Sequence, residues 1–77
     1  MELQVITPKG VALRTQVERV TVPGTAGMFT ILNNHAPIVS TLAPGQVSYL
    51  GPEGEKQIEI KESMVQVTAN VIKIIGR

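Results

Sequence analysis

Residues 22–37 read VPGTAGMFTILNNHAP, and this stretch decides how the rest of the chain folds. Gly24 and Gly27 can adopt the positive φ that branched residues resist, whereas Pro23 and Pro37 each fix φ. The backbone is therefore closely specified on both sides of one apolar segment. Such a segment builds a contact surface more readily than a reaction centre.

Outward from this stretch, apolar residues alternate with polar ones in short segments that each end at Gly, Pro or Asn. Period two is typical of β-strands. The expected strands lie near 3–7, 11–13, 19–22, 28–32, 38–42, 47–49, 58–60, 64–67 and 71–75. Spacing typical of an amphipathic helix is absent from the sequence. The prediction is one all-β domain over residues 1–77, a small two-layer β-sandwich or flattened barrel of about eight to ten short strands with little or no helix.

Two local features of the strand pattern are also predicted. Val17 beside Glu18 breaks the alternation by one residue, which indicates a β-bulge there. The last two strands are joined by Thr68-Ala69-Asn70, where Asn70 can take the left-handed backbone region at low cost.

The segment from Met28 to Leu32 leaves an alternative open. It is apolar except for Thr30, as expected of a strand covered on both sides or of one whose outer face meets another protein. Met28 and Phe29 are accordingly either ordinary core residues or an exposed docking patch. The sequence favours neither reading.

Composition excludes several classes of function. Seven Lys and Arg balance six acidic residues without a basic run, so nucleic acid is not an expected partner. No apolar run approaches the roughly 20 residues that span a bilayer, so no direct membrane insertion is expected. The start of the chain lacks the pattern of a signal peptide, and Cys is absent, which fits a reducing compartment.

Nothing in the sequence forms a recognisable catalytic or metal-binding group. His35 is the only histidine and has no partner at a spacing typical of catalysis, so we expect it to sit in a turn or pack on a partner. The glycines at 24 and 27 resemble a phosphate loop but lack the following Lys and helix. We therefore expect no catalytic residue, no metal, no cofactor and no small-molecule substrate.

Five segments, in this order and spacing, resemble a known family. They are LQVITPKGVAL (3–13), VERVTVPGTAGMFTIL (17–32), HAP (35–37), LAPG (42–45) and MVQVTANVIKII (64–75). Together they resemble the N-terminal β-sandwich domain of the epsilon subunit of the rotary proton-translocating ATP synthase. The resemblance covers essentially the whole sequence.

The resemblance implies a non-catalytic rotor subunit of the central stalk, which links the gamma subunit to the c-subunit ring for ATP synthesis coupled to proton transport. It also implies a location at the cytoplasmic face of the bacterial inner membrane, as a peripheral part of the complex. The positions that it assigns to the c-ring side are Met28, Phe29, Asn33 and Asn34. Those that it assigns to the gamma side are Thr7, His35 and Ser40.

Departures from the family pattern change two expectations. Relatives often carry an acidic residue where Met28 stands, which suggests a more apolar contact here. In many relatives a two-helix region that brakes ATP hydrolysis follows the sandwich, whereas this sequence stops at Arg77. If the sequence is complete, the implied subunit lacks that helical brake. The alternative is a stand-alone β carrier or small-ligand-binding barrel, which predicts a deep internal cavity.

Overall fold

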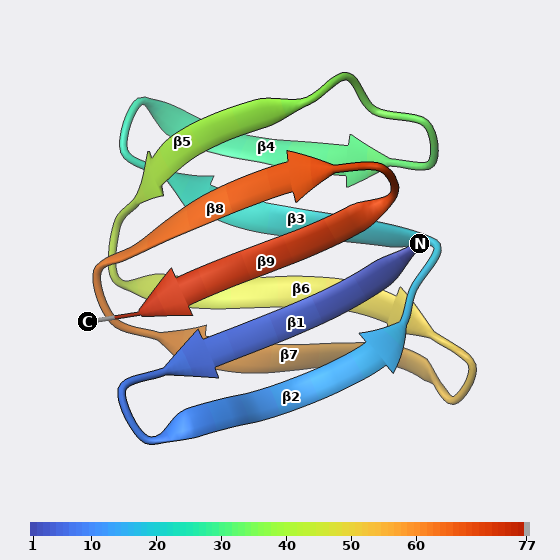
Figure 1. The fold of residues 1–77 in the computed structure, drawn as a ribbon, viewed down its shortest axis with the longest axis horizontal. Coiled ribbons are helices and arrows are strands. Elements are labelled where there is room, and N and C mark those ends of the chain that lie inside the picture. Colours follow the sequence, from blue (N-terminus) through green and yellow to red (C-terminus); the bar gives the residue numbers. More distant parts are fainter. Residues whose placement is uncertain (77) are drawn as a thin grey trace.

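The structure is a computed structural model that describes residues 1–76, and nine β-strands account for most of them (Figure 1). No helix occurs among these residues. The strands are β1 (Glu2–Thr7), β2 (Gly10–Gln16), β3 (Arg19–Gly24), β4 (Gly27–Leu32), β5 (Ile38–Leu42), β6 (Gly45–Gly51), β7 (Gly54–Ile60), β8 (Ser63–Thr68) and β9 (Val71–Gly76).

The strands form two layers that meet at one corner. The order β2-β1-β9-β8-β5 makes the front sheet in Figure 1, and β4-β3-β6-β7 makes the sheet behind it. A single residue pair, Gly24 with Leu42, links β3 to β5 and so joins the sheets. The predicted all-β, two-layer fold is confirmed.

The first and last strands lie side by side. β1 pairs in parallel with β9, with Leu3 opposite Ile72 and Val5 opposite Ile74, whereas the other pairings are antiparallel. This parallel pair joins residues at the two ends of the chain. No local pattern in the sequence indicates it, because parallel neighbours are never joined by a tight turn.

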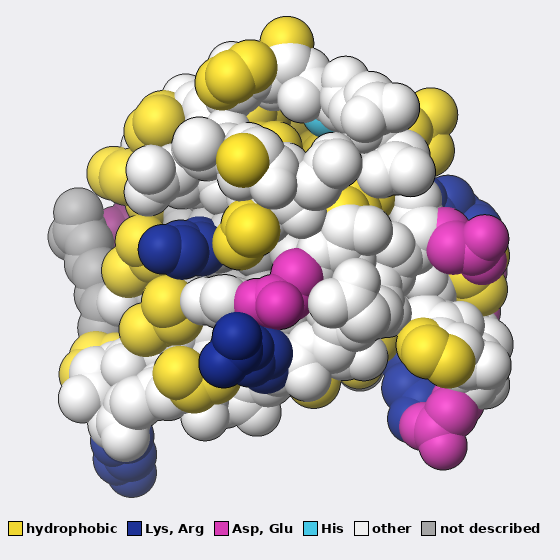
Figure 2. Space-filling view, turned by 45° about the vertical axis from the view of Figure 1, so that its right-hand side comes forward, with side chains coloured by type: hydrophobic (Ala, Val, Ile, Leu, Met, Phe, Trp, Pro, Cys, Tyr) yellow, Lys and Arg dark blue, Asp and Glu magenta, His cyan; other side chains and the backbone are white. Residues whose placement is uncertain are grey.

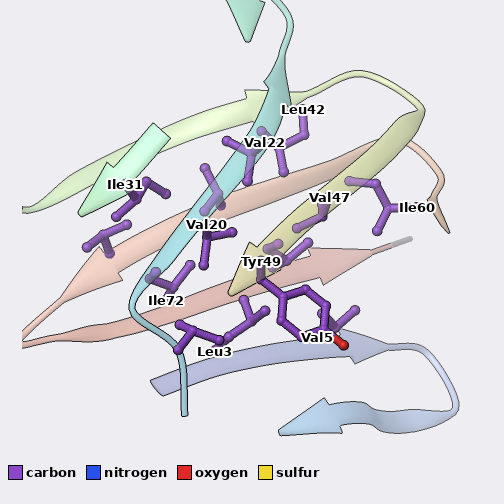
Figure 3. Packing of buried hydrophobic residues seen from close by; sticks show 14 residues of the cluster. Leu3, Val5, Val20, Val22, Ile31, Leu42, Val47, Tyr49, Ile60 and Ile72 are labelled. Carbon is purple, nitrogen blue, oxygen red and sulfur yellow. The ribbon is translucent and has the colours of Figure 1, made fainter. Parts of the chain in front are cut away.

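The core lies between the two sheets and is filled by one side chain in two along each strand (Figure 3). The side chains expected to face inward are buried, including Val20, Val22, Val47 and Tyr49. The largest that are completely buried are Leu3, Ile31, Leu42, Ile72, Ile74, Val20, Val22, Val47 and Val65. Thr7, which shares one face of β1 with the buried Leu3 and Val5, is only half-buried.

The bulge predicted at Val17 and Glu18 is wrong, because these residues carry the chain from one sheet to the other. The Val17 N–H donates to Met1 O at 2.8 Å, while the Glu18 N–H donates to Leu50 O in the opposite sheet, also at 2.8 Å. The alternation of apolar and polar residues shifts by one there because the chain passes from one sheet to the other, and the core lies between them. The register shift of the β1–β2 pair lies instead at Ala12, which is extra between the partners of Val5 and Ile6.

The turn between β8 and β9 has two residues with positive φ. Ala69 has φ 49° and Asn70 has φ 62°, which is the backbone of a type I′ hairpin turn. The left-handed conformation predicted for Asn70 is confirmed. Ala69 is the less suitable residue, because a non-Gly side chain in this region is strained and Asn tolerates it better than Ala.

Ala69→Asn is therefore expected to stabilise the fold. Relief of part of the left-handed strain should raise the free energy of unfolding by about 0.5 kcal/mol. That gain corresponds to a rise in Tm of about 2 to 4 °C for a domain of this size, measurable by thermal denaturation. Ala69→Val is the matched control and should lower Tm, because β-branching makes positive φ less accessible. A lower Tm for Ala69→Asn would contradict this view of the turn.

Gly24 and Gly27 turn out to be required for different reasons. Gly27 has φ +135°, as anticipated from the sequence, but Gly24 does not have a positive φ. A Cβ atom at Gly24 would instead lie 2.6 Å from Gly27 O and 2.8 Å from Phe29 Cε1. Gly24 is therefore needed for space, at the corner where the two sheets join.

Candidate functional site

The outer face of the five-stranded sheet carries a row of paired side chains that crosses every strand and is apolar on four of the five. Residues directly opposite one another on neighbouring strands place their side chains side by side. The pairings join Val11 to Ile6, Ile6 to Ile75, Ile75 to Met64 and Met64 to Thr41. We call these five residues the apolar row. Val11 is 62% exposed and Met64 44% exposed, so the row is available for contact.

Beside the apolar row the same face becomes polar. The next row of paired residues contains Arg14, Gln4, Lys73 and Gln66. In Figure 2, hydrophobic side chains run down the left of this face and charged side chains lie nearer its centre. Along β1, β8 and β9 the change from apolar to polar takes two residues, the spacing of neighbours on one face of a strand. On β5 the order is reversed, because the exposed Val39 lies opposite Gln66.

Glu2 organises part of this polar region. Its carboxylate accepts hydrogen bonds from the Gln4 amide and from Arg14 Nε, the latter at 3.2 Å. The Gln4 hydrogen bond, followed by the charge of Arg14, lowers the pKa of Glu2. Glu2 therefore remains ionised, and the charges around it are paired.

The outer face of the other sheet has a different character. Thr21 and Thr30 share a hydrogen bond of 2.8 Å between their hydroxyls, and Arg19 Nη2 contacts both Glu55 oxygens at 2.7 and 2.9 Å. At the adjoining turn Lys56 Nζ lies 2.9 Å from Glu53 Oε1; this contact lowers the pKa of Glu53 and raises that of Lys56. The continuous apolar row thus distinguishes one face of the sandwich.

β4 resolves the alternative that the sequence left open for residues 28–32. Ile31 is fully buried and Phe29 is half-buried against the core, so these two side chains point inward. Met28 and Leu32 point outward and are 71% and 56% exposed. β4 is therefore covered on one side only, with two large apolar side chains on the other.

The residues predicted for the c-ring side do not gather at one end of the sandwich. Met28 begins β4 beside the β3–β4 turn, whereas Asn33 and Asn34 follow its other end. At about 3.3 Å per residue, Leu32 lies about 13 Å along the strand from Met28. Asn34 has φ 64°, and its N–H donates to Asn70 Oδ1 at 3.2 Å. All but Phe29 are exposed.

The residues predicted for the gamma side are also spread out. Thr7 ends β1 at the Pro8-Lys9 turn, where its hydroxyl donates to Gly10 O and accepts the Lys9 N–H, both at 3.2 Å. His35 lies at the opposite end, between β4 and β5. Ser40 is half-buried, and it alternates with Val39 and Thr41, which point outward from β5.

His35 makes only local contacts. Its Nδ1 donates to Ala36 O at 2.8 Å and its backbone N–H donates to Leu32 O at 3.2 Å. These contacts fit a histidine in a turn. Within residues 1–76, no group of three or more His, Asp or Glu side chains is arranged to hold a metal ion.

The hollows on the described part of the surface offer no deep internal cavity. The most apolar one, of about 440 Å³, opens at the edge where β1 and β2 face β7, with Val5, Ile58 and Ile60 in its lining. The Lys9 and Lys61 side chains lie at the same hollow. The binding barrel considered as an alternative requires an enclosed space, and this hollow is an open groove. No helix within residues 1–76 is long and apolar enough to cross a membrane.

The apolar row was missed by the sequence analysis. Ile6, Met64 and Ile75 each stand at an outward position of a correctly predicted strand, but the row exists only because of the cross-strand register. One signal in the sequence could have indicated it: several strands carry an apolar residue at a position where the alternation calls for a polar, outward-facing one. Which of these residues are neighbours depends on the parallel β1–β9 pair.

A family model matches the whole chain. Residues 1–77 match the ATP synthase, Delta/Epsilon chain, beta-sandwich domain. The chain is 33% identical over 75 residues to the ATP synthase epsilon chain of Leptospira borgpetersenii, covering 97% of this chain and 59% of the relative. It is 37% identical over 71 residues to the epsilon chain of Nitratiruptor sp., covering 91% of this chain and 55% of the relative.

Solved structures share the fold at lower sequence identity. A chain in the cryo-EM structure of the Euglena gracilis mitochondrial ATP synthase, OSCP/F1/c-ring, matches with a TM-score of 0.86 and 23% identity over 96% of this chain and 48% of that one. A chain in the Tetrahymena thermophila mitochondrial ATP synthase central stalk/c-ring structure matches with a TM-score of 0.80 and 21% identity, over 97% of this chain and 61% of that one. This chain spans a little over half the length of the first two relatives.

Proposed function

Because the chain belongs to the family of ATP synthase delta/epsilon chain β-sandwich domains, we propose that it is a non-catalytic rotor subunit in the central stalk of a proton-translocating ATP synthase. In this role it links the gamma subunit to the c-subunit ring, so that rotation is coupled to ATP synthesis and proton transport. Two sheets packed through completely buried side chains form a stiff body, which suits a part that transmits torque.

The apolar row is the observation that carries the proposal. A monomeric protein seldom leaves a contiguous apolar patch on one face unless that patch binds something. The apolar side chains of the row run from Val11 on β2 to Met64 on β8. On the opposite face the large exposed apolar side chains are Met28 and Leu32 of β4, and β3 and β7 carry hydroxyl and charged groups.

We assign the outer face of the five-stranded sheet to gamma, with Thr7 at the end of β1 and His35 in the loop before β5. Ser40 lies on β5 between the outward-pointing Val39 and Thr41, so it would support this face from the inner side.

We assign β4 and its following turn to the c ring. Met28 presents an exposed thioether that can fill an irregular apolar contact. Phe29 would support Met28 from the core side, while Asn33 and Asn34 would add polar contacts at the other end of the strand. Because these residues lie at opposite ends of β4, the ring surface would run along the strand.

The proposed location follows from the proposed partners. A subunit held between gamma and the c ring is a peripheral part of the membrane complex, at the cytoplasmic face of the inner membrane in a bacterium. The chain itself is proposed to hydrolyse no ATP.

Binding to the gamma subunit of the same organism tests the assignment of the apolar row. Met64→Lys places a charge within the row, between Ile75 and Thr41, and burying an unpaired charge at an interface is costly. The variant should bind gamma at least about tenfold more weakly, which corresponds to about 1.4 kcal/mol. Isothermal titration calorimetry of the purified proteins measures this change.

Gln57→Lys is the matched control, since Gln57 is exposed on β7 of the opposite sheet. This variant should bind gamma as the unchanged chain does, and both variants should retain their Tm. Equal binding by Met64→Lys and the unchanged chain would refute the assignment of this face. Failure of the unchanged chain to bind gamma at all would refute the rotor role.

A further inference from the structure

One edge of β4 has no neighbouring strand. The position of Pro23 in β3 shows which residues of β4 point their backbone N–H and C=O groups toward this open edge. β4 pairs only with β3, and Met28 stands opposite Pro23. Because proline has no N–H, this pair cannot exchange hydrogen bonds. The Pro23 carbonyl accepts the Ala43 N–H at 2.8 Å, on the side of β3 away from β4. Since the pairs of an antiparallel ladder alternate, the backbone groups of Met28, Thr30 and Leu32 point to the open edge.

This edge lacks the protection that other edge strands of the molecule have. Charged side chains on an edge strand oppose pairing with another chain. β7 carries Glu55, Lys56 and Glu59, and β2 carries Arg14, whereas β4 has no charged residue. β5 is also uncharged, but near its end it meets the β3–β4 turn, where the Thr25 N–H donates to Thr41 O at 3.1 Å.

We propose that the open edge of β4 binds a second copy of this chain through the same strand. Two copies of β4 can pair antiparallel about a two-fold axis at Thr30, so that each Met28 stands opposite the partner's Leu32. In this register the core-facing side chains of the two copies lie on the same face of the joined sheet, because Phe29 stands opposite the partner's Ile31. Such a contact is self-complementary, brings apolar side chains together and opposes no like charges.

A second copy fits this edge better than an unrelated extended segment. The exposed side chains of Met28 and Leu32 would cover each other twice, once on each side of the axis, and the Thr30 hydroxyls would meet at its centre. The two four-stranded sheets would become one continuous eight-stranded sheet. The backbone groups of Met28 and Thr30 that point to the open edge would then be paired on both chains. The Leu32 carbonyl, which already accepts the His35 N–H at 3.2 Å, would accept a second hydrogen bond.

Association through one strand is expected to be weak. A contact of this length falls well below the roughly 1,200 Å² of a standard stable interface. We expect a dissociation constant of about 0.1 to 1 mM for the free chain. The inference does not rest on the rotor role, although a chain docked through β4 on a ring could not pair through β4 at the same time.

Two double variants that differ only in one charge test the pairing and its register. In Met28→Glu/Leu32→Glu the two substituted positions face each other across the axis as like charges, so the dimer should be lost. In Met28→Lys/Leu32→Glu, Lys at position 28 of each copy faces Glu at position 32 of the other copy. Two pairs of opposite charges form, so the dimer should return. Both variants place Glu beside Arg19, the partner of residue 32 on β3, so that local effect cancels.

Sedimentation equilibrium between about 0.05 and 1 mM measures the outcome, with circular dichroism to verify that each variant is folded. We expect a monomer–dimer equilibrium for the unchanged chain and for Met28→Lys/Leu32→Glu, and at least tenfold weaker association for Met28→Glu/Leu32→Glu. An unchanged chain that is monomeric at 1 mM would overturn the proposal. So would failure of the opposite-charge variant to associate, or undiminished association of the like-charge variant.

Thr30→Pro provides an independent variant should the double variants not fold. It removes the N–H at the two-fold axis without removing a backbone hydrogen bond to β3, and Pro is accepted on edge strands where the N–H faces outward. The hydroxyl contact of Thr30 with Thr21 is lost as well, at an exposed site. This variant should be folded and monomeric at 1 mM. A folded Thr30→Pro chain that still dimerises would overturn the proposal.

Discussion

Leu42→Ala is expected to lower the free energy of unfolding by about 3 kcal/mol, within the range of about 2 to 5 for loss of a buried Leu side chain. Leu42 is completely buried and stands opposite Gly24, at the single strand pair that joins the two sheets within residues 1–76. A cavity at this corner can close only if one sheet moves. For a domain of this size the loss corresponds to a fall in Tm of about 12 to 24 °C.

Urea denaturation of the two variants of β5 checks this expectation. Val39→Ala is the control, because Val39 lies on the same strand but is 68% exposed and points outward. Its effect should stay within about 0.5 kcal/mol. If both variants lost similar stability, the burial of Leu42 would not be the cause. The slope of the unfolding free energy against urea concentration should be unchanged in both variants, because neither substitution greatly alters the surface that unfolding exposes.

Gly24→Ala is expected to lower the free energy of unfolding by about 2 kcal/mol, because the added methyl group has no space. Its Cβ would stand 2.6 Å from Gly27 O, a backbone atom held by the hairpin, and 2.8 Å from Phe29 Cε1. Phe29 would have to move, and with it the beginning of β4. Thermal denaturation should show the loss, and the Phe29 ring resonances should shift in NMR spectra.

Gly45→Ala is the matched control for Gly24→Ala. Its nearest side-chain atom would be Pro23 Cβ at 3.4 Å, at the limit of ordinary contact. Because φ is not positive at either glycine, neither substitution adds left-handed strain. Gly45→Ala should therefore change stability by much less than Gly24→Ala. Equal losses would show that the crowding at Gly24 is relieved by small movements and that another effect dominates.

The strands and their inward residues were predictable because each depends on local order. Leu3, Val20 and Val47 belong to alternating segments, and each of these is buried as expected. The turn at Asn70 was predictable for a similar reason, since the left-handed preference belongs to the residue itself. Gly24 was the exception. Its requirement comes from Phe29, five residues away, and not from its own φ.

The candidate site was only partly predictable. Resemblance to a family selected Met28 and Phe29, and the structure shows that one side chain is exposed and the other packs against the core. The partner assigned to each remains a proposal. The apolar row through Ile6, Ile75 and Met64 could not be predicted, because two of its four cross-strand steps depend on neighbours of β9.

The sequence by itself determined that this chain folds into short β-strands with one buried side each, because period two and turn chemistry act over a few residues. Only the tertiary structure decided which strands are neighbours and in what register. Pairing β1 with β9 joins residues about seventy positions apart, and the free energy of that contact is set by closure of the whole sandwich. That register turns scattered outward residues such as Ile6 and Met64 into one continuous surface.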